Sequence, residues 1–279
     1  MSETVFAALS DLHASFAPDA KARLSAFLRA AQADGAQLIA QLGDFARPEP
    51  QNEGLLRRFN AFAGAKLQVL GNHDLKMDSL GAALRFYGLE KGFYACDFGG
   101  LRFIALNGSY IRLGGVTQAY SRAKHGRLAA RAAYPVLPEE QIAFLRQALE
   151  ESALPTVILT HQSLCGGPFG RGLANGREVV KLLLGLRARG RAILACLNGH
   201  DHLFARREIE GLPFLTLPSA SYRFAGFEAL PRLRESGLAR GLILRKGVPY
   251  ALCRFDAGKG RLRVEIRRAE LLPGDEEGR

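Results

Sequence analysis

The feature that most constrains the fold is an alternation of apolar and amphipathic stretches over residues 5–70. The stretches Val5–Ser10, Gln37–Leu42 and Lys66–Leu70 are short and apolar, which predicts buried strands. Apolar residues at helical spacing predict a helix over 18–33, and a shorter helix covers 53–62. This βαβαβ order is typical of parallel strands joined by right-handed crossovers. The chain is therefore predicted to have an α/β fold.

The middle and the C-terminal part of the chain predict further strands. A short helix at 81–87 is followed by two apolar stretches, 92–98 and 101–106, which predict a β-hairpin turning at Gly99-Gly100. The remaining predicted elements are helices at 138–151 and 176–189 and strands at 156–160, 192–197, 203–209, 214–217, 241–244, 250–255 and 262–266.

Two stretches interrupt this pattern. Residues 108–135 are rich in Gly, Arg and Tyr and have weak periodicity, which indicates a long excursion. Loops of that length in a compact domain are usually functional. Residues 230–238 interrupt the C-terminal strands. The sequence shows no repeat or linker, so we expect a single domain over 1–279, in which strands within 203–270 complete the second sheet.

Composition narrows the class of protein. No apolar run is long enough to cross a membrane and no N-terminal signal pattern is visible, so we expect no membrane span. The 4 cysteines are widely spaced without a CxxC pair, which favours a cytoplasmic protein. The net charge of +11 indicates either an anionic partner such as nucleic acid or the arginine usage of a GC-rich genome. Basic residues are spread over the chain, so a nucleic-acid partner is less favoured.

Polar side chains follow five of the predicted strands, at the point where each strand ends. Ligands of open α/β sheets bind outside the carboxyl ends of the strands, so we expect these side chains to converge. Each one alone has a structural interpretation, such as a helix cap at Asp11, a turn residue at Asp44 or an Asx-turn at Asn72. Together they include five of the 6 histidines, which capping does not explain. The residues are Asp11, His13, Asp44, Asn72, His73, Asp74, His161, His200 and His202.

The stretch after the predicted strand 192–197 contains a histidine pair, His200 and His202. Gly199 gives the backbone the freedom to turn here. Imidazole groups suit zinc, iron, manganese and nickel, so the pair is a candidate set of metal ligands.

In this order, the five stretches resemble the motif series of the calcineurin-like metallophosphoesterases: DxH, GD, GNH[DE], a single H, and GHxH. The resemblance spans about residues 5–205. It implies a four-layer α/β/β/α sandwich, in which two mixed central β-sheets are flanked by helices. The matching residues are Asp11-Leu12-His13, Gly43-Asp44, Gly71-Asn72-His73-Asp74, His161 and Gly199-His200-Asp201-His202.

The resemblance also implies a cofactor, two divalent metal ions (Mn, Fe, Zn or Ni). A carboxylate that bridges the ions offsets their repulsion, and a bridging hydroxide attacks phosphorus in line. The implied ligands are Asp11, His13 and His202 for the first ion, Asn72, His161 and His200 for the second, and Asp44 as the bridge.

In the same scheme His73 is a catalytic residue and not a ligand, and it protonates the leaving alkoxide. A structural histidine supporting the turn is the alternative. Many phosphoprotein phosphatases of this family carry GDxxDRG, whereas this chain has Arg47 in place of the second aspartate. This difference argues against a Ser/Thr protein phosphatase. We expect that Asp74 orients His73 instead, or that Arg47 meets the phosphate.

The expected substrate is a small phosphorylated molecule, with nucleotides among the candidates. The alternatives are a cyclic-nucleotide phosphodiesterase or nuclease acting on diesters and, more remotely, a non-catalytic scaffold of the same fold. Relatives with GNRD in place of GNHD, the lipid-A-pathway hydrolases, are disfavoured. The candidate substrate contacts are Arg47, Arg112, Arg122, His125, Arg171 and Tyr222.

Overall fold

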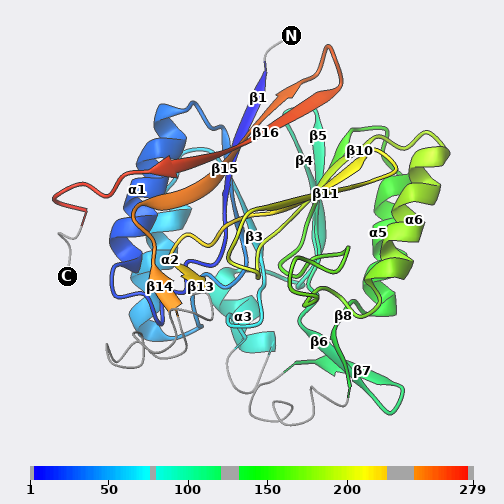
Figure 1. The fold of residues 1–279 in the computed structure, drawn as a ribbon, viewed down its shortest axis with the longest axis horizontal. Coiled ribbons are helices and arrows are strands. Elements are labelled where there is room, and N and C mark those ends of the chain that lie inside the picture. The colour runs from blue at the N-terminus through cyan, green and yellow to red at the C-terminus, as the bar shows by residue number, and fades with distance from the viewer. Residues whose placement is uncertain (1–2, 76–79, 121–131, 225–241, 276–279) are drawn as a thin grey trace.

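Two large mixed β-sheets lie at the centre of the molecule, and helices cover their outer faces (Figure 1). The computed structural model describes residues 3–75, 80–120, 132–224 and 242–275. The predicted four-layer α/β/β/α sandwich is therefore confirmed. The predicted interruption at 230–238 lies outside the described residues.

The first sheet has five strands in the order β16-β15-β1-β2-β3. The strands β1, β2 and β3 are parallel, as their crossovers predict, whereas β15 and β16 are antiparallel additions beside β1. Their bounds are β1 Thr4–Leu9, β2 Leu38–Leu42, β3 Ala65–Val69, β15 Val248–Asp256 and β16 Arg261–Ala269.

The second sheet has six strands in the order β11-β12-β10-β9-β5-β4. Its middle strands are parallel, and an antiparallel hairpin closes each side. Gly99 and Gly100 have φ of 57° and 77°, as a two-residue turn between β4 and β5 requires. The bounds are β4 Tyr94–Phe98, β5 Leu101–Ala105, β9 Thr156–Leu159, β10 Ile193–Asn198, β11 Ala205–Ile209 and β12 Leu212–Thr216.

The sequence-based assignment of the C-terminal strands was wrong in part. Within 203–270, β11 and β12 complete the second sheet, but β15 and β16 belong to the first. Pairing between β1 and β15 joins residues as far apart as Thr4 and Phe255. An apolar strand pattern predicts burial but does not specify which distant strand pairs with it.

Helices α1 and α2 cover the first sheet, and α5 and α6 cover the second (Figure 1). None of the described helices is long and apolar enough to span a membrane. The helix bounds are α1 Ala20–Ala33, α2 Glu53–Asn60, α3 Leu80–Tyr87, α5 Glu139–Glu150 and α6 Gly176–Ala188, with a 3-10 turn η1 at Pro50–Asn52.

Two small sheets lie at the end of the sandwich where the parallel strands terminate (Figure 1). The excursion 108–135 is not a loop throughout, because it contains the three-stranded sheet β7-β6-β8. The other small sheet pairs β13 with β14. The bounds are β6 Tyr110–Leu113, β7 Val116–Ala119, β8 Ala133–Val136, β13 Tyr222–Phe224 and β14 Leu242–Leu244.

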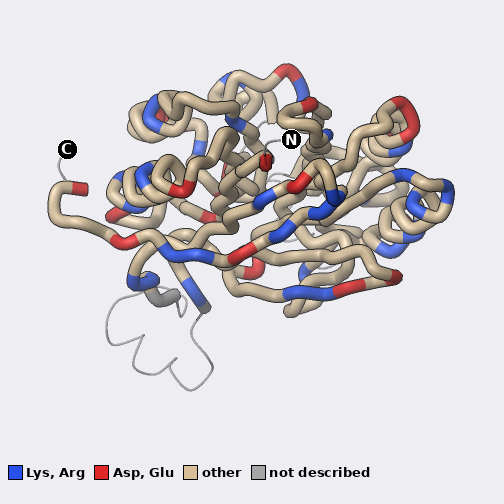
Figure 2. The backbone as a smooth tube through the Cα atoms, turned by 90° about the horizontal axis from the view of Figure 1, so that it is seen from above, with Lys and Arg blue, Asp and Glu red and all other residues tan. Residues whose placement is uncertain are grey.

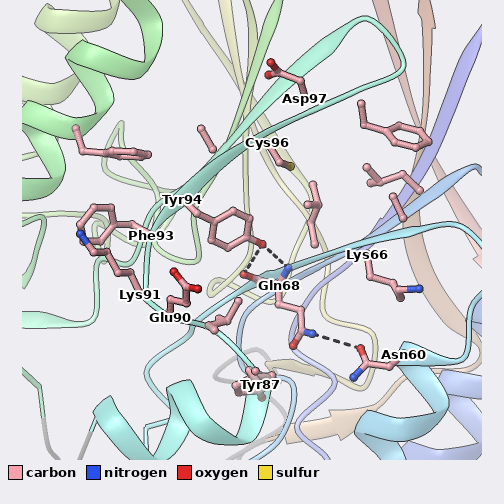
Figure 3. Close-up of a pocket in the computed structure, with 18 residues that line it drawn as sticks. Asn60, Lys66, Gln68, Tyr87, Glu90, Lys91, Phe93, Tyr94, Cys96 and Asp97 are labelled. Carbon is pink, nitrogen blue, oxygen red and sulfur yellow. Dashed lines mark hydrogen bonds between the residues drawn. The ribbon is translucent and has the colours of Figure 1, made fainter. Parts of the chain in front are cut away.

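The facing surfaces of the two large sheets form an apolar core, in which Phe6 and Phe103 meet edge to face at 5.1 Å. Along the edge strands β3 and β4 lies a cleft of about 900 Å³ (Figure 3). There the Tyr94 hydroxyl accepts a hydrogen bond from Gln68 N at 2.8 Å and donates one to Gln68 O at 3.0 Å. Tyr94 therefore connects the two sheets at this edge.

Charged residues of both signs are interspersed around the molecule (Figure 2). On the edge strand β16, for example, Glu265 lies between Arg263 and Arg267. The view in Figure 2 shows no continuous stripe of Lys and Arg.

Candidate metal centre

The polar residues that follow the strands come together at one end of the sandwich, with contributions from both large sheets. Asp11 follows β1, and Asp44 follows β2. From the second sheet, His161 follows β9 and His200 follows β10. The centre therefore lies across the interface between the two sheets, at the carboxyl ends of their parallel strands.

One group of side chains consists of Asp11, His13 and His202, which are all buried and whose ligand atoms lie within 4.8 Å of one another. The Nε2 atoms of His13 and His202 are 3.0 Å apart. His202 Nε2 is 3.3 Å from Asp11 Oδ1, and His13 Nε2 is 3.7 Å from the same oxygen. Three donor atoms thus face one point.

A second group consists of Asp44, His161 and His200, again within 4.8 Å. His161 Nε2 is 3.2 Å from Asp44 Oδ2 and 3.2 Å from His200 Nδ1. His161 Nδ1 lies 2.8 Å from the carbonyl oxygen of Leu42 and donates to it, because a carbonyl can only accept. In the neutral ring, which is the form that ligates a cation, this bond leaves the Nε2 lone pair directed at the group.

Asp44 lies between the two groups, since its Oδ2 is also 3.8 Å from His13 Nε2. Asp11 Oδ1 is buried and has no hydrogen-bond partner among the described residues. A buried carboxylate oxygen without a partner is costly unless a cation binds it. The donor set of imidazole nitrogens and carboxylate oxygens fits divalent transition metals.

The charges in this cluster depend on one another. Burial alone would raise the pKa of Asp44. The imidazoles of His161, His73 and His13 lower it by more than burial raises it, so the pKa lies well below its ordinary value. Burial likewise raises the pKa of Asp11, and His202 and His13 lower it below its ordinary value. Both carboxyl groups are therefore ionised, which is the form that ligates a cation.

The pKa values of the two histidines of the second group are shifted in opposite directions. Burial lowers the pKa of His161, but the neighbouring Asp44 carboxylate raises it to about 10. Burial and the positive charge of His161 lower the pKa of His200 to about 3.

The backbone around the centre is unusual. Six non-glycine residues of the described chain have a positive φ, and five of them are candidate ligands; the sixth is Glu210. Left-handed conformations are uncommon outside glycine, although Asp and His adopt them more readily than most residues. The five ligands are Asp11 (55°), His13 (53°), Asp44 (53°), His200 (71°) and His202 (58°).

Gly199 has a different role from the one its sequence position indicates. It is not among the glycines with positive φ, and the turn is made by His200 and His202 themselves. A Cβ at position 199 would lie 1.7 Å from Ser10 Oγ and 2.5 Å from Asp11 Oδ2. Glycine is therefore needed for space, because two motif-bearing loops approach each other here.

Asn72 and His73 are half-buried beside these groups. Gln162 Nε2 donates to Asn72 Oδ1 at 3.5 Å and to Ser109 Oγ at 3.2 Å. The His73 backbone N–H donates to Asp44 Oδ1 at 2.7 Å, and the His73 ring lies 5.0 Å from the ring of His13. The Asp44 carboxylate raises the pKa of His73, but burial and nearby imidazoles lower it to below its usual value.

The hydrogen bonds that the Asp74 carboxylate accepts from the described residues come from groups other than His73. Its Oδ2 accepts the backbone N–H groups of Asp44 and Gly71, both at 2.8 Å. Its Oδ1 accepts the N–H of Ala46 at 3.0 Å and the Tyr87 hydroxyl at 2.9 Å. Asp74 instead holds together the two loops that carry Asp44 and Asn72.

Three of the predicted substrate contacts, Arg47, Arg171 and Tyr222, adjoin the candidate ligands. Arg112 on β6 pairs with Glu139 at 3.0 Å, and Arg171 pairs with Asp201 at 3.0 Å and donates to His200 O at 3.3 Å. Arg47 lies over the Phe16 ring. The remaining three are Tyr222, whose hydroxyl donates to Phe16 O at 2.5 Å, and Arg122 and His125, which lie outside the described residues.

Several contributors were missed in the sequence. The hydroxyls of Ser219 and Ser221 both donate to the carbonyl oxygen of Asp11, at 2.8 and 2.9 Å. Ser10 Oγ donates to Asp11 Oδ2 at 2.6 Å. Ser10 adjoins a motif and could have been singled out, but the two later serines lie in a stretch without any motif. Arg245 donates to the His202 carbonyl at 2.5 Å and is equally unmarked.

The chain matches a known protein family. The family model described as calcineurin-like phosphoesterase matches residues 4–204. A search of curated proteins found no match.

Solved structures with a similar fold come from several organisms. A dimetal phosphatase from Danio rerio is 16% identical, with a TM-score of 0.55, over 96% of this chain and 99% of that one. GAP50, described as the anchor in the inner membrane complex of Plasmodium, is 11% identical with a TM-score of 0.58, over 98% and 90%. The protein TT1561 of Thermus thermophilus is 13% identical with a TM-score of 0.52, over 95% and 99%. At these identities the similarity concerns the fold.

Proposed function

Since the chain belongs to the calcineurin-like phosphoesterase family, we propose that it hydrolyses small phosphate esters with two divalent metal ions. The observation that carries the proposal is the pair of buried ligand groups with Asp44 between them. When bound, such ions supply a nucleophile from water at neutral pH and neutralise charge on the phosphoryl oxygens.

The roles of individual residues follow from the contacts. Asp11, His13 and His202 would hold one ion, and His161 and His200 the other, together with Asn72 through its amide oxygen. Asp44 would contact both ions, and its Oδ1 is fixed by the His73 N–H. The Asp74 carboxylate accepts the backbone N–H groups of Asp44 and Gly71 and so fixes the two loops relative to each other.

His73 is the proposed general acid. Its ring is half-buried beside the first group, edge to face with His13 at 84°, and does not belong to either ligand group. From this position the imidazole can protonate the oxygen of the departing alcohol. The proton matters most for alcohols of high pKa, because their alkoxides are poor leaving groups.

The His73→Ala variant should therefore retain both metals and lose most of its activity on esters of poor leaving groups. We expect a loss of about 10²–10⁴-fold in kcat for alkyl phosphates, and a much smaller loss for p-nitrophenyl phosphate. Metal content by elemental analysis and kcat on both substrates measure this. A collapse of the metal content would show that His73 is a ligand and not an acid.

The function itself is tested with p-nitrophenyl phosphate, bis-p-nitrophenyl phosphate and cyclic nucleotides, each with Mn, Fe, Zn and Ni. We expect metal-dependent turnover, and the ratio of the first two substrates separates a phosphatase from a phosphodiesterase. An Asp44→Asn variant is the matched negative control, because it keeps the shape but removes the shared charge. Absence of turnover with every metal would refute the enzyme assignment.

A further inference from the structure

An exposed aromatic side chain lies at the metal centre. Phe16 follows the first motif by three residues, and it is 45% exposed. Its ring centroid is 5.6 Å from that of His73 and 6.0 Å from that of His13. Phe16, His13, His73 and Arg47 also line one small recess.

The ring is held in place from several sides. The Phe16 N–H donates to His13 O at 2.8 Å, and the Tyr222 hydroxyl donates to Phe16 O at 2.5 Å. The Arg47 guanidinium lies 4.6 Å from the ring centroid, as in a cation–π contact. Burial of this residue would remove apolar surface from water, yet the fold leaves nearly half of it open. A fixed, exposed ring is a surface on which a flat ligand can stack.

The position of the ring relative to His73 indicates which part of a substrate it meets. If His73 protonates the departing alcohol, that alcohol lies beside the His73 imidazole, and Phe16 is the aromatic neighbour of that imidazole. The phosphoryl group of such a substrate would face the two ligand groups.

We propose that Phe16 is the stacking platform for the leaving group, so that the preferred substrates are phosphate esters of alcohols carrying a flat aromatic ring. This inference rests on the proposed function and adds the substrate class. The aromatic ring can belong to a nucleoside or to an aryl or benzyl alcohol, since both present a π-face.

The test uses phosphonates, which bind without being hydrolysed. Calorimetry on the metal-loaded protein compares benzylphosphonate with cyclohexylmethylphosphonate, which has a similar size but no flat ring, and with methylphosphonate. The phosphonate analogue of adenosine 5′-monophosphate forms the nucleoside arm. We expect Phe16→Ala and Phe16→Leu to weaken the Kd of the aromatic ligands by about tenfold and that of methylphosphonate by less than about twofold. Phe16→Tyr should bind the aromatic ligands as the wild type does.

The matched control is Phe169→Ala. Phe169 is also exposed, at 52%, and also lies beside an arginine, with Arg171 5.4 Å from its ring centroid. This variant should bind both benzylphosphonate and methylphosphonate as the wild type does. Equal losses for benzylphosphonate and methylphosphonate in Phe16→Ala, or no loss for either, would overturn the inference. If the wild-type protein bound no phosphonate with any metal, the proposed function would fail instead.

Discussion

At the level of single residues, the centre depends on ligands held in left-handed backbone conformations. Such conformations cost on the order of 1 kcal/mol or more each and persist where the surroundings enforce them. The contacts that enforce them are visible: Asp11 N donates to Gly43 O at 3.0 Å, and His13 N donates to Asp44 O at 2.8 Å. Consecutive motifs therefore fix one another's backbone, and with it the orientation of Asp11 and His13.

At Gly199, the loop that carries His200 approaches the loop that carries Asp11 so closely that there is no space for a Cβ atom. In Gly199→Ala, the added methyl group would overlap Ser10 Oγ at 1.7 Å and displace Asp11 Oδ2. We expect metal affinity to fall by about 10–100-fold, because the Asp11 carboxylate loses its orientation. Titration of the metal-free protein with Zn or Mn against a competing chelator measures the effect.

The control for that substitution is Gly185→Ala in helix α6. There the nearest atom to the added methyl group is the flexible end of Arg189, at 3.6 Å. Alanine favours helix formation, so we expect unchanged metal affinity and a gain of up to about 1 kcal/mol in stability. Equal metal affinity in Gly199→Ala and Gly185→Ala would contradict the steric role of Gly199.

At the level of elements, helix α1 is fixed by a buried arginine. Arg23 is 1% exposed and donates to the carbonyl oxygens of Ala220, Arg245 and Gly247, as well as to Asp19. The first two of these carbonyls lie on the segments around β13 and β14, close to the serines that hold Asp11. Through Arg23, the helix thus fixes the backbone next to Ser219 and Ser221, which hold the Asp11 carbonyl.

Arg23→Ala should destabilise the fold by about 3 kcal/mol, because three carbonyl groups and Asp19 lose a buried charged donor. Arg23→Lys should recover only part of the loss, since an ammonium group lacks the forked geometry of guanidinium. The control is Arg57→Ala, which removes another i,i+4 pair, with Glu53 at 3.4 Å, where both side chains are exposed. That change should cost less than about 0.5 kcal/mol in chemical denaturation. Similar costs for Arg23→Ala and Arg57→Ala would disprove the anchoring role.

Much of the element order could be predicted from the sequence because apolar periodicity is local. The strand ends carrying Asp11, Asp44 and His161 were found in this way, and so was the hairpin at Gly99-Gly100. Asp74 shows the limit. Its partner Tyr87 lies 13 residues along the chain at the end of α3, and only tertiary packing brings that hydroxyl to the carboxylate. The three-stranded sheet within 108–135 was missed for a similar reason, since its strands are short and half-exposed.

At the level of the whole molecule, the two sheets must keep a fixed separation, because each contributes ligands to the same centre. The apolar core between the sheets supplies most of this constraint. At the β3–β4 edge, the Tyr94 hydroxyl adds a polar link to the backbone of Gln68 (Figure 3). Without it, the N–H and C=O of Gln68 would lose their partner on this side.

Tyr94→Phe should therefore lower the free energy of unfolding by about 1–2 kcal/mol at pH 8. The effect should also depend on pH. Burial raises the pKa of Tyr94 above its ordinary value, which is about 10 in the unfolded chain. A raised pKa stabilises the fold below pH 10, and this contribution is lost as the pH rises from there towards the folded-state pKa.

The difference in the free energy of unfolding between wild type and Tyr94→Phe isolates this contribution, because the other tyrosines are common to both proteins. Each pH unit above 10 should reduce the difference by about 1.4 kcal/mol, so the two proteins should become almost equally stable near pH 11. Urea denaturation at pH 8, 9, 10 and 11 measures it, with the metal removed from both proteins so that ligand protonation does not contribute. A difference that stays constant across this range would mean that the Tyr94 hydroxyl titrates normally and does not link the sheets.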